Sequence, residues 1–125
     1  MPKTILVVDD SIAMRLQVSI ALKQSGFLTV EAADGQEGLA VVDSNRNIAM
    51  VICDVNMPKM DGIEMVKQIK SKPEHQSLPI VMLTTGGDVS LVRRAKHAGA
   101  VGWIVKPFKR SQLVQTVTQL IDLIT

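Results

Sequence analysis

The sequence has few cysteines and few aromatic residues. Cys53 is its only cysteine, so no disulfide can form within the chain, and a reducing compartment fits best. It has no tyrosine, one tryptophan and two phenylalanines, which leaves no evident aromatic platform for stacking bases. No apolar run approaches the roughly 20 residues of a membrane span, and the N-terminal residues lack the apolar stretch of a signal peptide. We therefore expect a cytoplasmic protein without membrane insertion.

Length and composition indicate one folded unit. The 125 residues fit a single compact domain over residues 1–125, and the 46% of hydrophobic residues can supply a sizeable core. The formal net charge is +2, which is too weak to argue for a nucleic-acid partner.

Short apolar runs alternate with helical patterns along the whole chain. The apolar runs cover residues 5–8, 28–32, 48–53, 80–83 and 102–105; the helical patterns cover 11–24 and 34–44, then begin at 61, at 88 (ending near 99) and at 111. Five strands alternating with five helices predict an α/β fold, with a doubly wound parallel sheet, right-handed crossovers and helices on both faces.

Four of the predicted helices have recognisable sequence features. Asp34 and Asp61 are each followed three residues later by glutamate, which is typical of a capping box. Asp88 is a candidate cap for a later helix. The segment 11–24 has two apolar stripes and predicts a helix with a broad buried face; the stripes are Ile12, Leu16 and Ile20, and Met14, Val18 and Ala21.

Polar residues follow four of the five predicted strands. In a parallel sheet of this kind, ligands bind outside the carboxyl ends of the strands. We therefore expect the residues at these ends to meet at one edge of the sheet, although they are far apart in sequence: Asp9, Asp10, Asp54, Thr84 and Lys106.

The three aspartates at this edge point to a bound cation. Two carboxylates about 5 Å apart repel by about 3 kcal/mol at an effective dielectric constant of about 20. A hard divalent ion with oxygen ligands relieves this repulsion, and Mg²⁺ is the abundant candidate. Together with a metal ion, the Lys106 ammonium and the Thr84 hydroxyl suit a phosphoryl group, with Asp54 as a candidate nucleophile that forms an acyl phosphate.

Each of these residues also has a structural interpretation. Asp10 or Ser11 can be a simple helix N-cap. Thr84 alone fits the end of a strand, and Lys106 alone fits a solvated surface position. Their joint placement at four strand ends is what favours a functional site.

Four motifs resemble the receiver domain of two-component signalling, the response-regulator superfamily. They are Val8–Ser11, Cys53–Gly62, Met82–Thr85 and Val105–Phe108, and the resemblance covers essentially the whole chain. It implies the flavodoxin-like strand order 2-1-3-4-5. Residues 10–15 and 102–108 are most similar to single-domain chemotaxis response regulators.

The resemblance implies a phosphorylation-activated switch rather than an enzyme acting on other substrates. By this resemblance, Asp54 would accept a phosphoryl group from a histidine kinase in a magnesium-dependent reaction. Asp10, Asp54 and the backbone carbonyl of Asn56 would hold Mg²⁺, with Mn²⁺ as a substitute, and Asp9 would act mainly through water.

Further roles follow from the same resemblance. Lys106 would pair with the phosphoryl group, Thr84 would hydrogen-bond it, and the Lys106–Pro107 bond is expected to be cis. Trp103 stands at the position of the switch aromatic, where the family commonly has Tyr or Phe. Asn56 and Gly86 occupy positions that tune dephosphorylation.

Output is expected through contact with another protein, because no effector follows the last predicted helix. Basic residues and Trp103 form the candidate output surface for an acidic partner segment, with a solvated face as the other interpretation: Arg93, Arg94, Lys96, Trp103, Lys109 and Arg110. The candidate target is a flagellar or pilus motor component. We expect the protein to be a monomer.

The same residues bear on other classes of function. A stand-alone phosphorelay intermediate or phosphate sink would use the same residues. A flavodoxin-like nucleotide binder is disfavoured because Asp9 and Asp10 would repel a phosphate where such proteins have a phosphate loop. A phosphoaspartate phosphatase is disfavoured because its two acids stand two residues apart, whereas these are adjacent.

Overall fold

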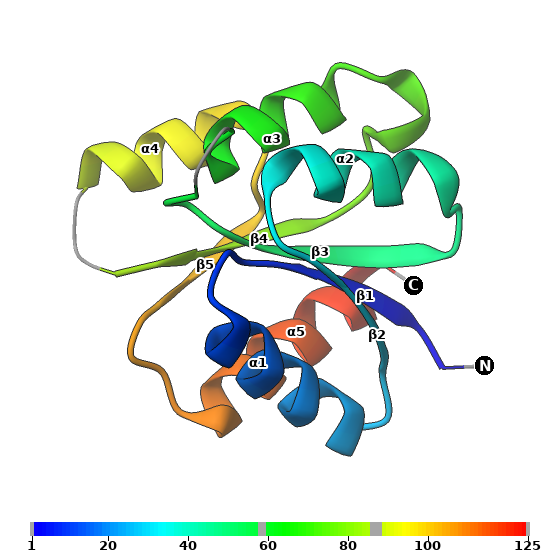
Figure 1. The fold of residues 1–125 in the computed structure, drawn as a ribbon, viewed down its shortest axis with the longest axis vertical. Coiled ribbons are helices and arrows are strands. Elements are labelled where there is room, and N and C mark those ends of the chain that lie inside the picture. Colours follow the sequence, from blue (N-terminus) through cyan, green and yellow to red (C-terminus); the bar gives the residue numbers. More distant parts are fainter. Residues whose placement is uncertain (1, 58–59, 86–88, 125) are drawn as a thin grey trace.

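The computed structural model describes residues 2–57, 60–85 and 89–124, with no side-chain description for residue 124. Within these ranges, strands and helices alternate, with one 3-10 turn, η1, before the fourth strand (Figure 1). The elements are β1 (Thr4–Val8), α1 (Ile12–Gln24), β2 (Leu28–Ala32), α2 (Gly35–Ser44), β3 (Ile48–Asp54), α3 (Gly62–Lys70), η1 (Pro73–His75), β4 (Ile80–Thr84), α4 (Val89–Ala98), β5 (Gly102–Val105) and α5 (Arg110–Ile124).

The strands form one parallel sheet in the order β2-β1-β3-β4-β5. Helices α2, α3 and α4 cover one face of the sheet, and α1 and α5 cover the other (Figure 1). This is the doubly wound α/β fold with the flavodoxin-like strand order expected from the sequence.

The central strands are buried because both faces of the sheet are covered. Side chains alternate along β1, so Leu6 and Val8 join the core beneath α2, α3 and α4, while Ile5 and Val7 join the core above α1 and α5. All four are fully buried, which explains why this strand is a continuous apolar run.

Capping side chains begin three helices where the sequence predicts them. Ser11, Asp34 and Asp61 each accept a hydrogen bond from the backbone N–H three residues later, at 2.8–3.2 Å. The N-cap of α1 is Ser11, so the capping interpretation does not apply to Asp10. The candidate cap Asp88 lies outside the described residues.

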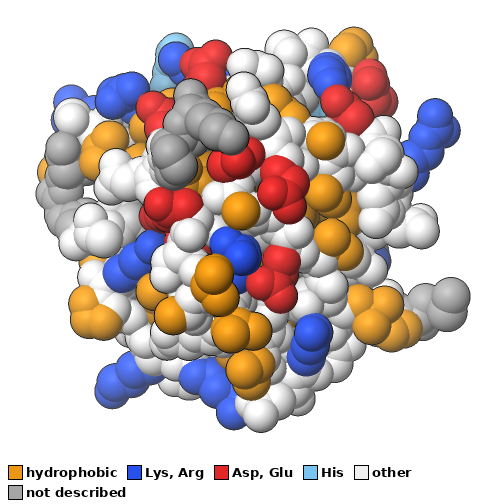
Figure 2. All heavy atoms as spheres, viewed as in Figure 1, with side chains coloured by type: hydrophobic (Ala, Val, Ile, Leu, Met, Phe, Trp, Pro, Cys, Tyr) orange, Lys and Arg blue, Asp and Glu red, His pale blue; other side chains and the backbone are white. Residues whose placement is uncertain are grey.

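The broad buried face predicted for α1 is wrong for one of its two stripes. Ile12, Leu16 and Ile20 are 67%, 49% and 52% exposed, while Val18 and Ala21 are buried. The helix contacts the sheet and α5 through one side only, so the neighbouring stripe faces solvent. Figure 2 shows hydrophobic side chains gathered over α1.

Some predicted boundaries shift by one residue. Strands β3 and β4 extend to Asp54 and Thr84, because Asp54 pairs in register with Leu83 and Thr84 with Val105. Helix α1 begins at Ile12 rather than at its cap, and α5 begins at Arg110. None of the described helices has both the length and the apolar character needed to cross a membrane.

Candidate functional site

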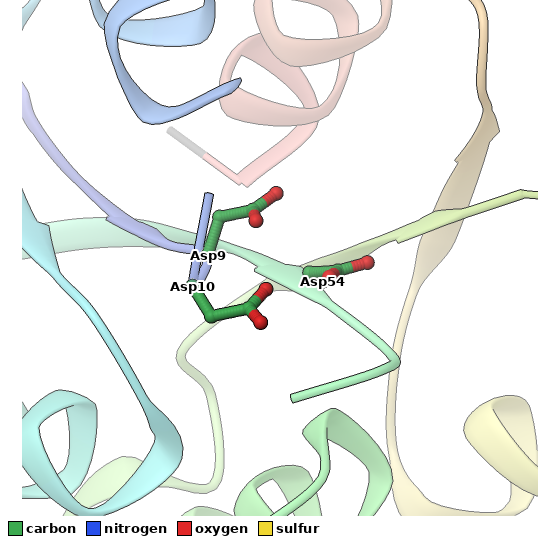
Figure 3. Close-up of side chains that lie close together, drawn as sticks. All are labelled: Asp9, Asp10 and Asp54. Atoms are coloured by element: carbon green, nitrogen blue, oxygen red, sulfur yellow. The ribbon is translucent and has the colours of Figure 1, made fainter. Parts of the chain in front are cut away.

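Three aspartates meet at the carboxyl ends of β1 and β3. Asp9 and Asp10 directly follow β1, and Asp54 is the last residue of β3. These strands are neighbours with Val8 opposite Cys53, so the following residues, Asp9 and Asp54, lie side by side. The strand order reverses its direction at this pair, as is typical of ligand sites in such sheets. Figure 3 shows the three aspartate side chains close together.

The carboxylates are close enough to share one ion. Asp9, Asp10 and Asp54 each offer an oxygen, and these oxygens all lie within 4.8 Å of one another. Asp9 and Asp54 are buried, whereas Asp10 is exposed. Negatively charged oxygen ligands with one open side fit a hard divalent cation that retains water molecules. This group of side chains could therefore hold a metal ion.

Lys106 connects two of the three acids. Its Nζ donates to Oδ1 of Asp54 at 3.1 Å and to Oδ2 of Asp9 at 3.3 Å. The lysine directly follows β5, and its backbone N–H donates to the carbonyl oxygen of Thr84 at 2.7 Å, which ties it to the end of β4. The Lys106–Pro107 peptide bond is cis.

The pKa of Asp54 is raised above the usual aspartate value. Burial is the largest cause, and the negative charges of Asp9 and Asp10 raise the pKa further. The hydrogen bond from Lys106 and its positive charge act in the opposite direction. The neighbouring Cys53 is fully buried, and burial raises the pKa of its thiol well above its ordinary value. Cys53 is therefore a core residue.

The remaining predicted residues surround the aspartates. Thr84 is buried at the end of β4, next to β3. Asn56 is exposed and lies two residues after Asp54. Trp103 lies on β5 opposite Met82 and is 38% exposed. Gly86 lies outside the described residues.

The predicted basic residues are all at the surface. Arg93, Arg94 and Lys96 are exposed on α4, and Lys109 and Arg110 are exposed where α5 begins. Between them, β5 is an edge strand of the sheet with three exposed apolar side chains on or beside it: Val101, Trp103 and Val105.

Two residues have geometric roles that the sequence analysis did not assign. A Cβ atom at Gly62 would lie 2.2 Å from the carbonyl oxygen of Asp54, so only glycine allows α3 to begin this close to β3. The Asp61–Gly62 pair was the available signal. Arg15 donates to the carbonyl oxygen of Asp9 at 2.7 Å, for which the sequence offers no signal.

Comparisons with known proteins agree with this geometry. The sequence model of the response regulator receiver domain family matches residues 5–118 of this chain. A probable chemotaxis protein CheY of Rhizobium etli is 39% identical over 105 residues, which span 83% of this chain and 81% of that protein.

Other similar proteins include one that is longer than this chain and one of similar length. The transcriptional regulatory protein PdtaR of Mycobacterium tuberculosis is 37% identical over 117 residues, which span 93% of this chain and 55% of that protein. The structure of the chemotaxis response regulator CheY4 of Vibrio cholerae superposes with a TM-score of 0.91 at 39% identity, covering 96% of this chain and 99% of that one. The chain belongs to the response regulator receiver domain family.

Proposed function

We propose that this receiver domain is a phosphorylation-activated switch in which Asp54 accepts a phosphoryl group from a histidine kinase. The observation that carries the proposal is the position of Asp54. Its carboxylate lies 3.1 Å from the Lys106 ammonium and shares a cluster with two further carboxylates. A buried nucleophile next to a cation is suited to an incoming dianion.

The transfer needs Asp54 in its carboxylate form. One oxygen of Asp54 forms a bond to phosphorus while the bond between phosphorus and the imidazole nitrogen of the donor breaks. The imidazole leaves with the electron pair and takes up a proton, and the phosphoryl group stays on Asp54 as an acyl phosphate. Lys106, which is already within hydrogen-bond distance, is available to move from the carboxylate to a phosphoryl oxygen.

The acidic cluster supports a magnesium site as part of this proposal. Asp10, Asp54 and the backbone carbonyl of Asn56 would be the ligands, with Asp9 acting mainly through water and Mn²⁺ as a substitute ion. When bound, the ion supplies positive charge against the phosphoryl oxygens. The buried Thr84 supplies a hydroxyl from the adjacent strand, and Trp103 responds as the switch aromatic.

The proposed output is contact with a protein partner in chemotaxis or motility. The names of the relatives from Rhizobium etli and Vibrio cholerae support this pathway. The exposed basic residues of α4 and α5, next to the exposed apolar side chains of β5, suit an acidic segment of a flagellar or pilus motor component.

We place the protein in the cytoplasm as a monomer. A phosphorelay intermediate or phosphate sink is the alternative with the same chemistry.

Acetyl phosphate tests the acceptor assignment without a known kinase. We expect intact-mass spectrometry to show one added phosphoryl group in the presence of Mg²⁺ and none when the metal is chelated. Asp54→Asn should remove the adduct, and Asp122→Asn, which changes an exposed acid on α5, should keep it. An adduct of the same yield on Asp54→Asn would contradict the assignment. Steady turnover of a generic phosphomonoester would favour a phosphatase instead.

A further inference from the structure

Arg15 lies on α1 and reaches back to the backbone beside the acidic cluster. Its Nη1 donates to the carbonyl oxygen of Asp9 at 2.7 Å, and its Nε donates to Oε1 of Glu31 on β2 at 3.3 Å. The side chain is only 16% exposed. One planar guanidinium therefore bridges a helix, a neighbouring strand and the turn that follows β1.

The carbonyl that Arg15 holds belongs to the peptide group that joins Asp9 to Asp10. Rotation of this peptide moves the Cα of Asp10 relative to Asp9, because a peptide group is a rigid plane. The other side of Asp9 is held by β2, since its N–H donates to the carbonyl oxygen of Ala32 at 3.1 Å. The turn is thus fixed from both sides, and Arg15 is the side chain that fixes the side leading to Asp10.

The carboxylate of Asp9 has its own restraints. It accepts a hydrogen bond from the backbone N–H of Ser11 at 2.9 Å and another from Lys106. Asp10 is exposed, so its position depends more on the backbone that carries it. The separation of the three carboxylates in Figure 3 therefore depends on the orientation of the Asp9–Asp10 peptide.

We propose that Arg15 is a positioning residue for the metal site, and that its bridge between Glu31 and the Asp9 carbonyl makes the cluster selective for Mg²⁺ over the larger Ca²⁺. The inference rests on the proposed function, because it assumes that the aspartates hold a divalent cation. Arg15 touches neither the ion nor the phosphoryl group in this scheme and acts only through the backbone of Asp9.

The physical reason is the different tolerance of the two ions. Mg²⁺ requires nearly octahedral ligands at about 2.0–2.1 Å, whereas Ca²⁺ accepts irregular ligands at about 2.3–2.6 Å. A loosened Asp9–Asp10 peptide therefore weakens Mg²⁺ binding more than Ca²⁺ binding. Loss of the arginine charge acts alike on both divalent ions, so the ratio of their affinities separates positioning from electrostatics.

Isothermal titration calorimetry with MgCl₂ and with CaCl₂ tests this inference. Arg15→Met retains an unbranched apolar stem and removes the donors. We expect its Kd for Mg²⁺ to rise about tenfold, which is the usual effect of losing an outer-shell partner. Its Kd for Ca²⁺ should rise by less than about threefold, because the larger ion tolerates the displaced ligand. The matched control is Lys23→Met, which removes an exposed charge from the same helix and should leave both constants unchanged.

A second variant makes the test independent of how well Arg15→Met folds. In Arg15→Lys, a single ammonium replaces the planar guanidinium and cannot donate to both acceptors with the same geometry. The ratio of Mg²⁺ affinity to Ca²⁺ affinity should therefore fall, by a smaller factor than in Arg15→Met. If either variant keeps the wild-type ratio of Mg²⁺ affinity to Ca²⁺ affinity, the positioning role is wrong. This holds also where a variant binds both ions equally more weakly and has a lower Tm. If the wild-type protein binds no Mg²⁺, the proposed function itself fails.

Discussion

Lys106 donates a hydrogen bond to Asp54 across 52 residues of sequence, with 3.1 Å between Nζ and Oδ1. The same ammonium reaches Asp9, so one positive charge faces three carboxylates. The cluster therefore retains negative charge for a divalent cation, while its buried members keep a hydrogen-bond partner when no ion is bound. Lys106 stabilises the metal-free state and is positioned for the proposed phosphorylated state.

Removal of the Lys106 ammonium should destabilise the metal-free protein. The side chains of Asp9 and Asp54 are 1% and 8% exposed, and loss of their shared partner leaves buried charge unpaired. We expect Lys106→Met to lower the free energy of unfolding by about 3 kcal/mol in urea titrations with a chelator present. The exposed Lys109→Met is the control and should change it little. Equal unfolding midpoints for the wild type and Lys106→Met would contradict this role.

The raised pKa of Asp54 gives the metal-free protein a specific pH dependence. Because the folded state holds the proton more tightly than the unfolded state, stability falls as pH rises from about 3.9, the unfolded pKa, through the raised folded pKa. Asp54→Asn removes this titration. The variant should gain stability relative to wild type across that window and keep the gain at neutral pH.

Urea unfolding of both proteins at a series of pH values measures this difference. Asp122→Asn, an exposed acid on α5, serves as the control and should follow the wild-type curve. A stability difference between Asp54→Asn and wild type that stays constant with pH would show that the effect comes from packing and not from the pKa.

The strand ends could be predicted from sequence because their chemistry depends on topology alone. In a parallel sheet the residues after successive strands share one edge, which brings Asp9, Asp54, Thr84 and Lys106 together. The hydrogen-bond partners of Lys106 in the metal-free state could not be predicted, because they depend on the reach of its side chain.

Other features could not be predicted from the sequence. Helical periodicity identifies two apolar stripes on α1 but not which one faces the sheet, and Ile12, Leu16 and Ile20 proved to be exposed. Arg15 donates its hydrogen bond to a backbone carbonyl oxygen, and a sequence does not show which carbonyl a side chain will contact. The Asp61–Gly62 pair marks the start of a helix, but the close approach of Gly62 to the backbone of Asp54 is seen only in the structure.

Asp10 should contribute to divalent-ion binding more than an exposed acid elsewhere. Its carboxylate lies within the cluster, yet Ser11 is the cap of α1, so the substitution leaves the helix start intact. We expect Asp10→Asn to weaken Mg²⁺ binding about tenfold or more in calorimetric titrations, while Asp122→Asn leaves it unchanged. Lower repulsion on Asp54 should also stabilise the metal-free protein slightly. Unchanged Mg²⁺ affinity would exclude Asp10 as a ligand.

Trp103 should report the switch through its fluorescence. It is the only tryptophan, and its 38% exposure leaves room for a more buried position. We expect a blue shift or a change in quenching when Mg²⁺ and a beryllofluoride mimic bind together, and a smaller change with Mg²⁺ alone. Asp54→Asn should lose the part that depends on the mimic. An unchanged spectrum with binding confirmed independently would leave Trp103 as a packing residue.

The most direct test of the central proposal is chemical trapping of the acyl phosphate. After reaction with acetyl phosphate and Mg²⁺, borohydride reduces an aspartyl phosphate to homoserine, and peptide mass spectrometry locates the change. We predict homoserine at position 54 alone, none after Asp54→Asn and none when the metal is chelated. Homoserine at Asp9 or Asp10, or its absence at position 54 in a protein that carries the phosphoryl group, would contradict the assignment of Asp54 as the acceptor.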